Sequence, residues 1–376
     1  MPLPIDPVAF ASELIRCPSV TPASGEVFDR LEAALTPLGF TVHRWVMGEP
    51  PDGPTENIVA IRGEGGPHFG FAGHLDVVPA GEGWNGDPFA AEIVDGLLVG
   101  RGANDMKSAI AAYVSALSRL GPTGGTLSLL ITGDEEGYAT WGTPRIIDWL
   151  NERNIRPDMI LIGEPTSVDR LGDTVKIGRR GSVNMWIEVP GVQGHVAYPH
   201  RATNPIPPLA RVISALDALH LDDGTEQFPP SNVEFTAIST PTNASNVIPG
   251  SATAQLNIRF NNLQSGADLV KMVEEIAERE APGSTVKARI SGEAFLTPPG
   301  PLYDVVVAAI EEETGAKPEL STSGGTSDGR FLIQLCPVVD FGLPNATMHK
   351  VGECAAVRDI EALSRIYEQI VRKVIG

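Results

Sequence analysis

The segment Gly70–Pro79 is the feature that most constrains the fold of this chain. Its apolar first half is typical of a buried β-strand, and that strand delivers His74 and Asp76 two residues apart. Side chains two apart on a strand point the same way, so a metal ligand and a carboxylate that orients it can share one site. Taken alone, the pair could equally be a buried histidine hydrogen-bonded to its neighbour. The rest of the chain favours the metal site.

Apolar strand-like runs alternate with amphipathic helical segments through the first half of the chain. We expect strands at residues 41–46, 57–62, 68–75, 126–132 and 159–162. We expect helices from Asp6, over 25–38, over 106–120 and over 143–153, and a hairpin at 91–100 turning on Asp95-Gly96. This alternation predicts an α/β sheet covered by helices.

The pattern changes after Arg179-Arg180. The following elements are expected as strand 183–189, helix 206–219, strands 233–239 and 252–260, helix 267–280 and strand 285–290. This is the βαββαβ order of a ferredoxin-like unit. The α/β pattern then resumes with helix 302–314, strand 337–341 and helix 360–374. We therefore predict a catalytic domain formed by residues 1–179 and 292–376, interrupted by an inserted domain at 180–291.

Composition excludes several classes of partner. The formal net charge of -19 would repel nucleic acids and anionic membranes. No apolar run approaches the roughly 20 residues of a membrane span, and the first twenty residues lack the pattern of a signal peptide. The cysteines, Cys17, Cys336 and Cys354, form no CxxC motif. We expect a cytoplasmic protein whose metal ligands, if any, are histidine and carboxylate.

Residues that can bind metal recur just after predicted strands or before the helix at 106–120. They are His74, Asp76, Asp105, Glu135, Glu136, Glu164 and His349. Open α/β sheets bind ligands outside the carboxyl ends of their strands, so several of these side chains should meet there. Clustered carboxylates repel one another unless cations neutralise them. Histidine with carboxylate suits zinc, cobalt or manganese better than calcium. A pair of ions sharing one carboxylate would leave another carboxylate free as a general base.

Longer motifs around these residues resemble those of the M20 peptidase family of dinuclear-zinc amidohydrolases and exopeptidases. They are Gly73–Pro79, Gly100–Lys107, Asp134–Gly137, Gly163–Pro165 and Met348–Lys350. Three further stretches are similar to the desuccinylases of that family: Gly178–Ser182, Gly194–His200 and Ser321–Phe331. The resemblance covers nearly the whole chain. It implies a zinc-exopeptidase-like α/β/α catalytic domain with an inserted ferredoxin-like dimerisation and lid domain.

The resemblance also implies roles for single residues. Two Zn²⁺ ions per subunit would share Asp105, with Co²⁺ an alternative in the second site. His74 and Glu164 would complete one site, and Glu136 and His349 would complete the other. Asp76 would orient His74, and Glu135 would be the general acid and base.

The inserted domain would complete the active site of a homodimer. By resemblance, His195 reaches in from the partner subunit and stabilises the oxyanion. Arg179 and Arg259 would bind substrate carboxylates. The full expected substrate pocket is Arg179, Ser182, Tyr198, Asn246, Arg259, Gly325, Thr326 and Asn345. The loop 239–245 departs from the family pattern, which leaves the position of Asn246 open.

The implied reaction is hydrolysis of N-succinyl-L,L-2,6-diaminopimelate, a small-molecule substrate of lysine and diaminopimelate biosynthesis. Another deacylase of the same family, acting on N-acetylornithine, or a dipeptidase would share the metal chemistry. A metal-binding protein without catalytic activity is the alternative from another class. The presence of Glu135 argues against it, because a non-catalytic site would have no use for an unligated carboxylate there.

Overall fold

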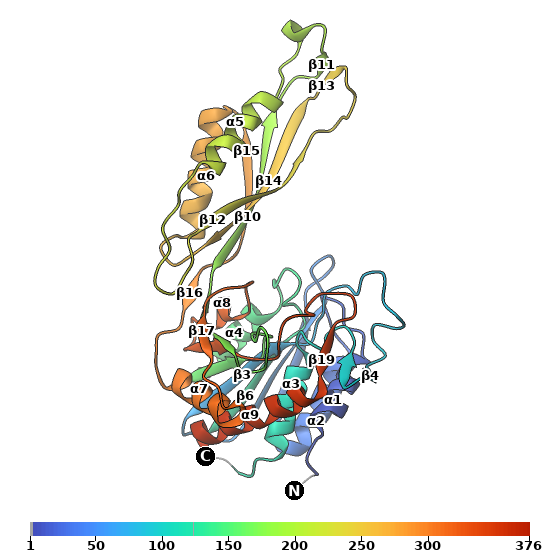
Figure 1. Ribbon diagram of the computed structural model, residues 1–376, viewed down its shortest axis with the longest axis vertical. Helices are drawn as coiled ribbons and strands as arrows, with labels where there is room; N and C mark the ends of the chain where they lie inside the picture. Colours follow the sequence, from blue (N-terminus) through green and yellow to red (C-terminus); the bar gives the residue numbers. More distant parts are fainter. Residues whose placement is uncertain (1–2, 123) are drawn as a thin grey trace. The chain divides into compact units, whose positions relative to one another are not determined.

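The computed structural model describes residues 3–122 and 124–376, which form two compact units (Figure 1). Unit 1 comprises Met1–Ile177, Thr297–Ser321 and Ser327–Gly376, and unit 2 comprises Gly178–Leu296 and Thr322–Thr326. The second unit thus extends slightly beyond the expected 180–291. The short strands β9 (Gly178–Arg179) and β16 (Phe295–Leu296) pair with each other, and Arg179 Nη1 donates to Gly325 O at 3.2 Å. These contacts attach both flanks and the Thr322–Thr326 turn to unit 2.

Unit 1 contains a mixed eight-stranded sheet. Its strands, in spatial order, are β1 (Thr41–Met47), β2 (Thr55–Arg62), β6 (Thr126–Thr132), β3 (His68–His74), β7 (Met159–Ile162), β18 (Val338–Asp340), β8 (Thr174–Lys176) and β17 (Glu319–Ser321). The central strands β6, β3, β7 and β18 are parallel neighbours, so their carboxyl ends share one edge of the sheet. The sequence did not predict β8 and β17, which have three residues each.

Helices cover both faces of this sheet, and every residue of β6 is buried. One group packs together: α1 (Pro7–Ile15), α3 (Lys107–Ser118), α7 (Pro301–Thr314) and α9 (Val357–Ile375). A second group, α4 (Thr143–Glu152) and α8 (Gly329–Leu332), contacts β2, β6 and β18. The remaining helices are α2 (Glu26–Leu35) and the 3₁₀ turn η1 (Thr36–Leu38). Asp6 caps α1 by accepting from the main-chain N–H groups of Val8 and Ala9.

A separate three-stranded sheet in unit 1 lies next in sequence to the segments that carry the predicted metal ligands Asp105 and His349. It contains β4 (Glu92–Val94), β5 (Leu97–Val99) and β19 (Cys354–Ala356). The predicted hairpin is confirmed: Asp95 and Gly96 both have positive φ, of 50° and 79°, as a two-residue primed turn requires. The strand β19 was not predicted; it pairs with β5 across a sequence separation that no local pattern reveals.

Unit 2 has the ferredoxin-like order predicted from the sequence. Its elements are β10 (Gly181–Pro190), α5 (Ile206–Asp217), β12 (Asn232–Ser239), β14 (Ser251–Phe260), α6 (Gly266–Glu280) and β15 (Thr285–Gly292). The antiparallel sheet has the order β12-β14-β10-β15, and its alternating buried side chains pack against α5 and α6. A two-stranded ribbon, β11 (Gly194–His195) with β13 (Val247–Ile248), and the 3₁₀ turn η2 (Pro199–Arg201) extend this unit.

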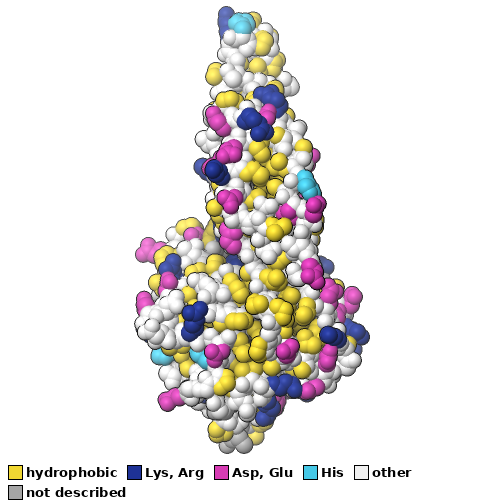
Figure 2. Space-filling model, turned by 90° about the vertical axis from the view of Figure 1, so that its left-hand side faces the viewer, with side chains coloured by type: hydrophobic (Ala, Val, Ile, Leu, Met, Phe, Trp, Pro, Cys, Tyr) yellow, Lys and Arg dark blue, Asp and Glu magenta, His cyan; other side chains and the backbone are white. Residues whose placement is uncertain are grey.

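On the face drawn in Figure 2, the acidic groups are scattered. Figure 2 shows acidic side chains distributed over the drawn face among apolar and basic ones. None of the helices in the described part of the chain combines the length and apolarity needed to cross a bilayer.

Candidate metal centre

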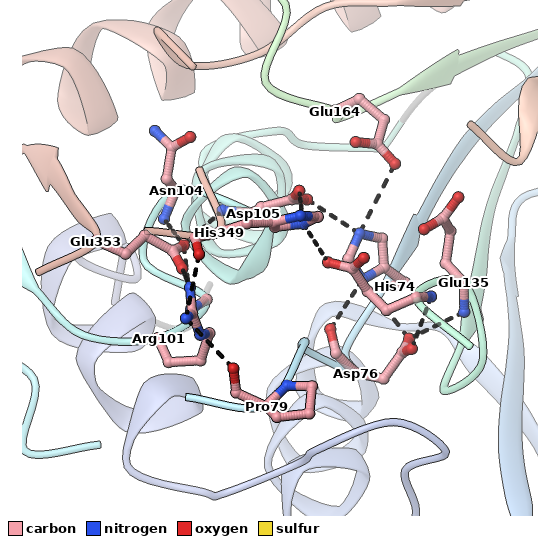
Figure 3. Close-up of polar contacts among 12 residues, drawn as sticks. His74, Asp76, Pro79, Arg101, Asn104, Asp105, Glu135, Glu164, His349 and Glu353 are labelled. Carbon is pink, nitrogen blue, oxygen red and sulfur yellow. Dashed lines mark hydrogen bonds and ion pairs between the residues drawn. The ribbon is translucent and has the colours of Figure 1, made fainter. Parts of the chain in front are cut away.

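Four sequence-predicted side chains follow the carboxyl ends of the adjacent strands β3, β6 and β7. His74 is the last residue of β3, Glu135 and Glu136 follow β6, and Glu164 follows β7. Because these strands are parallel neighbours, their ends bring the side chains together (Figure 3). Asp105 arrives from the turn before α3, and His349 from the loop between β18 and β19.

Two groups of potential metal ligands share Asp105. The first is His74, Asp105 and Glu164, and the second is Asp105, Glu136 and His349. His74 Nε2 lies 3.1 Å from Asp105 Oδ1 and 3.7 Å from Glu164 Oε1. His349 Nε2 lies 3.2 Å from Asp105 Oδ2 and 2.9 Å from Glu136 Oε1. Each carboxylate oxygen of Asp105 therefore faces a different group, as a bridging ligand requires.

The main chain selects the ring tautomer of His74. Its Nδ1 lies 2.9 Å from the Asp76 carbonyl oxygen, which can only accept a hydrogen bond. Nδ1–H therefore donates, and in the neutral ring the lone pair of Nε2 points toward Asp105 and Glu164. A histidine held in this way is suited to bind a cation through Nε2.

The electrostatics of the cluster favour positive charge. Burial alone would lower the pKa of His74, but the hydrogen bond to Asp105 and the nearby carboxylates of Asp76 and Glu164 raise it well above its usual value. Hydrogen bonds to Asp105 and Glu136 raise the pKa of His349 to about 10. Burial raises the pKa of Glu136 to about 7. Buried carboxylates here thus need cationic partners, and metal ions could supply them.

Asp76 holds the segment after β6 as well as lying beside His74. Its Oδ1 is 3.6 Å from His74 Nδ1, farther than its own main-chain carbonyl oxygen. The carboxylate accepts hydrogen bonds from the main-chain N–H groups of Glu135, at 3.2 Å, and Glu136, at 3.0 Å. We expected this carboxylate to orient His74. Its closer contacts are with the Glu135-Glu136 turn, and its role in orienting His74 stays a prediction.

Glu135 forms an ion pair that the sequence analysis did not assign. Arg330 Nη1 donates to Glu135 Oε1 at 3.2 Å, and both side chains are mostly buried, at 7% and 11% exposed. Arg330 lies in α8, within the Ser321–Phe331 stretch already singled out, but nothing local in that stretch indicates a contact with Glu135. The ion pair fixes the direction of Glu135, an acidic side chain that belongs to neither ligand group.

The expected substrate residues fall into two sets within unit 2 and one position in unit 1. Near the start of β10 lie Arg179, Ser182, Arg259, Gly325 and Thr326. Ser182 pairs with Arg259 across β10 and β14, and its hydroxyl accepts from Asn257. Arg179 is held by its bond to Gly325 O. Asn345 belongs to unit 1, where its N–H donates to Ser167 O.

The second set lies beyond the opposite end of β10. His195 and Val247 pair in the β11–β13 ribbon, and Val196 N donates to Asn246 O at 3.2 Å. This contact places Asn246 beside His195. The position of Asn246 had been open because the loop 239–245 departs from the family pattern. The Tyr198 ring lies 5.8 Å from the His195 ring. The ten residues of β10 span about 33 Å. Within one copy of unit 2, His195, Tyr198 and Asn246 are therefore far from Ser182.

Comparison with known proteins assigns the family. The model of the Peptidase family M20/M25/M40 matches residues 70–373. The chain belongs to this family. It is 60% identical to the succinyl-diaminopimelate desuccinylase of Rhizorhabdus wittichii over 372 residues, covering 99% of each chain. The enzyme of the same name from Zymomonas mobilis is 61% identical over 371 residues, again covering 99% of each chain.

Solved structures of the family share the fold. The M20 family metallo-carboxypeptidase Sso-CP2 from Sulfolobus solfataricus has a TM-score of 0.81 at 16% identity, covering 98% of this chain and 99% of that one. The YXEP protein of Bacillus subtilis, described as a dinuclear metal binding peptidase, has a TM-score of 0.70 at 17% identity, covering 98% and 97%. The predicted α/β fold with an inserted second domain is thereby confirmed. The two groups that share Asp105 are this chain's candidate ligands for a pair of metal ions.

Proposed function

We propose that this chain is a metal-dependent amidohydrolase that cleaves N-succinyl-L,L-2,6-diaminopimelate into succinate and L,L-diaminopimelate. The observation that carries the proposal is the pair of ligand groups joined at Asp105, with Glu135 beside them. The proposed substrate is that named for the desuccinylase relatives, which are about 60% identical over nearly the whole chain. The reaction belongs to lysine and diaminopimelate biosynthesis, and we accordingly propose a cytoplasmic location.

The donor set fits two Zn²⁺ ions, with Co²⁺ as an alternative in the second site. His74, Asp105 and Glu164 would hold one ion, and Asp105, Glu136 and His349 the other. When bound, the ions would lower the pKa of a water molecule and polarise the amide carbonyl.

Glu135 is the proposed general base and acid. It would take a proton from the attacking water and deliver it to the nitrogen of the departing amine. Two contacts orient Glu135. Its main-chain N–H donates to the Asp76 carboxylate, and its Oε1 accepts from Arg330. Neither contact occupies Oε2, and that oxygen is the one we assign to proton transfer.

His195 is the proposed oxyanion donor, acting in the partner subunit of a homodimer. Its Nδ1 accepts a hydrogen bond from Ala197 N at 3.0 Å, so the neutral ring carries its proton on Nε2. That N–H is available to a developing negative charge. The span of β10 separates His195 from the Arg179 set of the same unit, which supports delivery to a second copy. The inserted domain would be the dimerisation module and a moving lid.

The substrate's carboxylates would bind at arginines of unit 2. Burial and the neighbouring Arg180 both lower the pKa of Arg259, so its positive charge is disfavoured there. A bound substrate carboxylate would compensate that charge. Arg179 presents a second guanidinium near the same end of β10, and each can form paired hydrogen bonds with a carboxylate. Ser182, Tyr198, Asn246, Gly325, Thr326 and Asn345 would complete the pocket.

The deciding experiment measures succinate release from N-succinyl-L,L-diaminopimelate by zinc-loaded protein, with N-acetylornithine in parallel. A strong preference for the succinyl compound supports the proposal. Turnover of the acetyl compound alone would keep the metal chemistry and overturn the arginine-lined pocket. Two bound zinc ions with no turnover of either compound would exclude the proposed substrate.

A further inference from the structure

Arg101 and Glu353 form a buried ion pair next to the metal centre (Figure 3). Arg101 Nη1 lies 2.6 Å from Glu353 Oε2, and the side chains are 2% and 0% exposed. Burying two charges costs desolvation energy that their attraction often fails to recover, so such a pair is weak evidence for a role in stability. Its contacts with the main chain indicate a different role.

Glu353 holds the turn that carries Asp105. Its Oε1 accepts from three main-chain N–H groups: Gly102 at 3.1 Å, Asn104 at 2.8 Å and Asp105 at 3.0 Å. The local fold explains its position. Cys354 pairs with Val99 across β19 and β5, and Gly100 N donates to Glu353 O at 2.9 Å. One carboxylate therefore fixes the main chain of the residue shared by both ligand groups.

Arg101 holds the segment that carries His349. Its guanidinium donates to the carbonyl oxygens of Lys350, at 3.3 Å, and His349, at 3.5 Å. It also donates to Pro79 O at 3.4 Å and Ala80 O at 3.0 Å, in the segment that follows β3. The planar fork of an arginine can serve several acceptors at once, whereas a lysine ammonium cannot reproduce that geometry.

His349 needs such support. Its φ is 61°, in the left-handed region that residues other than glycine seldom adopt, although asparagine, aspartate and histidine enter it more often than other side chains. Its side chain is 43% exposed, whereas that of His74 is 1% exposed. His74 is placed by a central strand, but His349 lies on a loop whose carbonyl groups are bound by Arg101. The second ligand group therefore depends on this contact more than the first does.

We propose that Arg101, held by its ion pair with Glu353, is a positioning residue that sets the affinity of the Asp105–Glu136–His349 group for its metal ion. The inference rests on the ligand roles proposed above. Removing the fork of Arg101 should release the His349 turn while leaving the group formed by His74, Asp105 and Glu164 in place.

The test is a titration of metal-free protein with Co²⁺, followed by calorimetry and by the visible absorption of each bound ion. Arg101→Lys keeps the charge opposite Glu353 but loses the fork. We expect it to bind the first ion as the native chain does and the second about 10-fold to 100-fold more weakly, with an altered spectrum for that ion. Arg101→Met should show the same loss. If Arg101→Met does not fold, Arg101→Lys alone decides.

The matched control is Arg119→Lys, since Arg119, the C-cap residue of α3, pairs with Glu368 in α9 away from the centre. It should leave both affinities unchanged. Native affinity for the second ion in Arg101→Lys, or an equal loss in Arg119→Lys, would overturn the inference while the ligand assignment stands. A native chain that binds fewer than two ions would instead overturn the proposed ligand roles, and the inference with them.

Discussion

The two units differ in how firmly they hold the residues assigned to function. In unit 1, His74 and Asp105 are nearly inaccessible, at 1% and 5% exposed, and each lies in a network of main-chain hydrogen bonds. In unit 2, Tyr198 is 52% exposed, and His195 lies on a two-residue ribbon strand. The ligand groups of unit 1 are complete within one unit, whereas the residues assigned to the substrate, apart from Asn345 in unit 1, are divided between two ends of unit 2.

This contrast separates chemistry from recognition. Groups that must meet within a few tenths of an ångström are placed by strand ends and a buried ion pair, because preorganisation stabilises charge without reorganisation during the reaction. Groups that contact the substrate can be exposed if binding itself assembles them. We therefore expect substitution of Glu135 in unit 1 to change turnover at constant metal content, and unit 2 variants to act through the substrate or the partner copy.

The largest expected effect is that of Glu135→Gln. The amide keeps the shape of the side chain but cannot accept a proton, so kcat should fall by about 10³-fold. Both metal ions should remain bound, because Glu135 belongs to neither ligand group. Steady-state kinetics with metal analysis of the same sample measures both quantities.

The matched control for that variant is Glu92→Gln, which makes the same change on the exposed strand β4. It should retain native kcat. Turnover within tenfold of native in a fully metal-loaded Glu135→Gln protein would remove Glu135 from its role and break the assignment of chemistry to unit 1.

The next effect is that of His195→Ala. Losing an oxyanion donor should lower kcat by about 10²-fold to 10³-fold with metal content unchanged. If His195 serves the partner copy, mixing this variant with Glu135→Gln should restore activity. A mixed dimer then has one site with both Glu135 and His195, so random mixing should recover about a quarter of native activity.

The mixing experiment discriminates sharply between the two arrangements. If His195 acted within its own chain, every site in the mixed dimer would lack one of the two residues, and no activity would return. A single monomeric species in a sizing column at assay concentration would also contradict the dimer.

Most of the unit 1 ligands that sequence reasoning identified follow strong local patterns. His74, Glu136 and Glu164 come just after apolar runs, and adjacent parallel strands bring such positions to one edge. The motif around Asp105 precedes a helix that is buried on all sides. The sequence thus specifies both the strand and the residue that follows it.

Contacts between distant segments could not be found in this way. Glu353 meets Arg101 from a loop 252 residues away, and Arg330 meets Glu135 from 195 residues away. A charged residue in a loop is ordinarily solvated, so its sequence context does not indicate burial. The boundary of unit 2 differs from the predicted one for a similar reason. Gly325 belongs to unit 2 through its hydrogen bond with Arg179, and no change of composition in the sequence indicates that contact.

A smaller effect is expected for Arg259→Lys. Lysine keeps the charge but loses the paired donors that match a carboxylate, so kcat/KM for the succinyl substrate should fall by about 10-fold or more, mainly through KM. Arg211→Lys is the control, because Arg211 lies on the exposed side of α5 in the same unit. An unchanged KM in Arg259→Lys would show that the substrate carboxylate does not bind at Arg259 in β14.

The smallest expected effect is on stability alone, at Asp222 in unit 2. Its carboxylate accepts from Gly224 N at 2.9 Å, Ser231 N at 3.1 Å and Asn261 Nδ2 at 2.5 Å. Burial alone would raise the pKa of Asp222, but these hydrogen bonds lower it to about 2. A carboxyl group whose pKa is lower in the folded state stabilises that state above its unfolded pKa of about 4 and loses the effect as the pH falls toward 2.

Asp222→Asn should therefore lower the stability of unit 2 by about 1 kcal/mol at pH 7 and by progressively less from pH 4 downward. Hydrogen exchange of peptides from β12 and β14, compared with the native chain at each pH, measures this difference. Asp223→Asn is the neighbouring control, since that side chain is 94% exposed. Succinate release and metal content should not change in either variant. A loss of turnover in Asp222→Asn at pH 7 would show that the chemistry of unit 1 depends on the local stability of unit 2, and would break the separation between them.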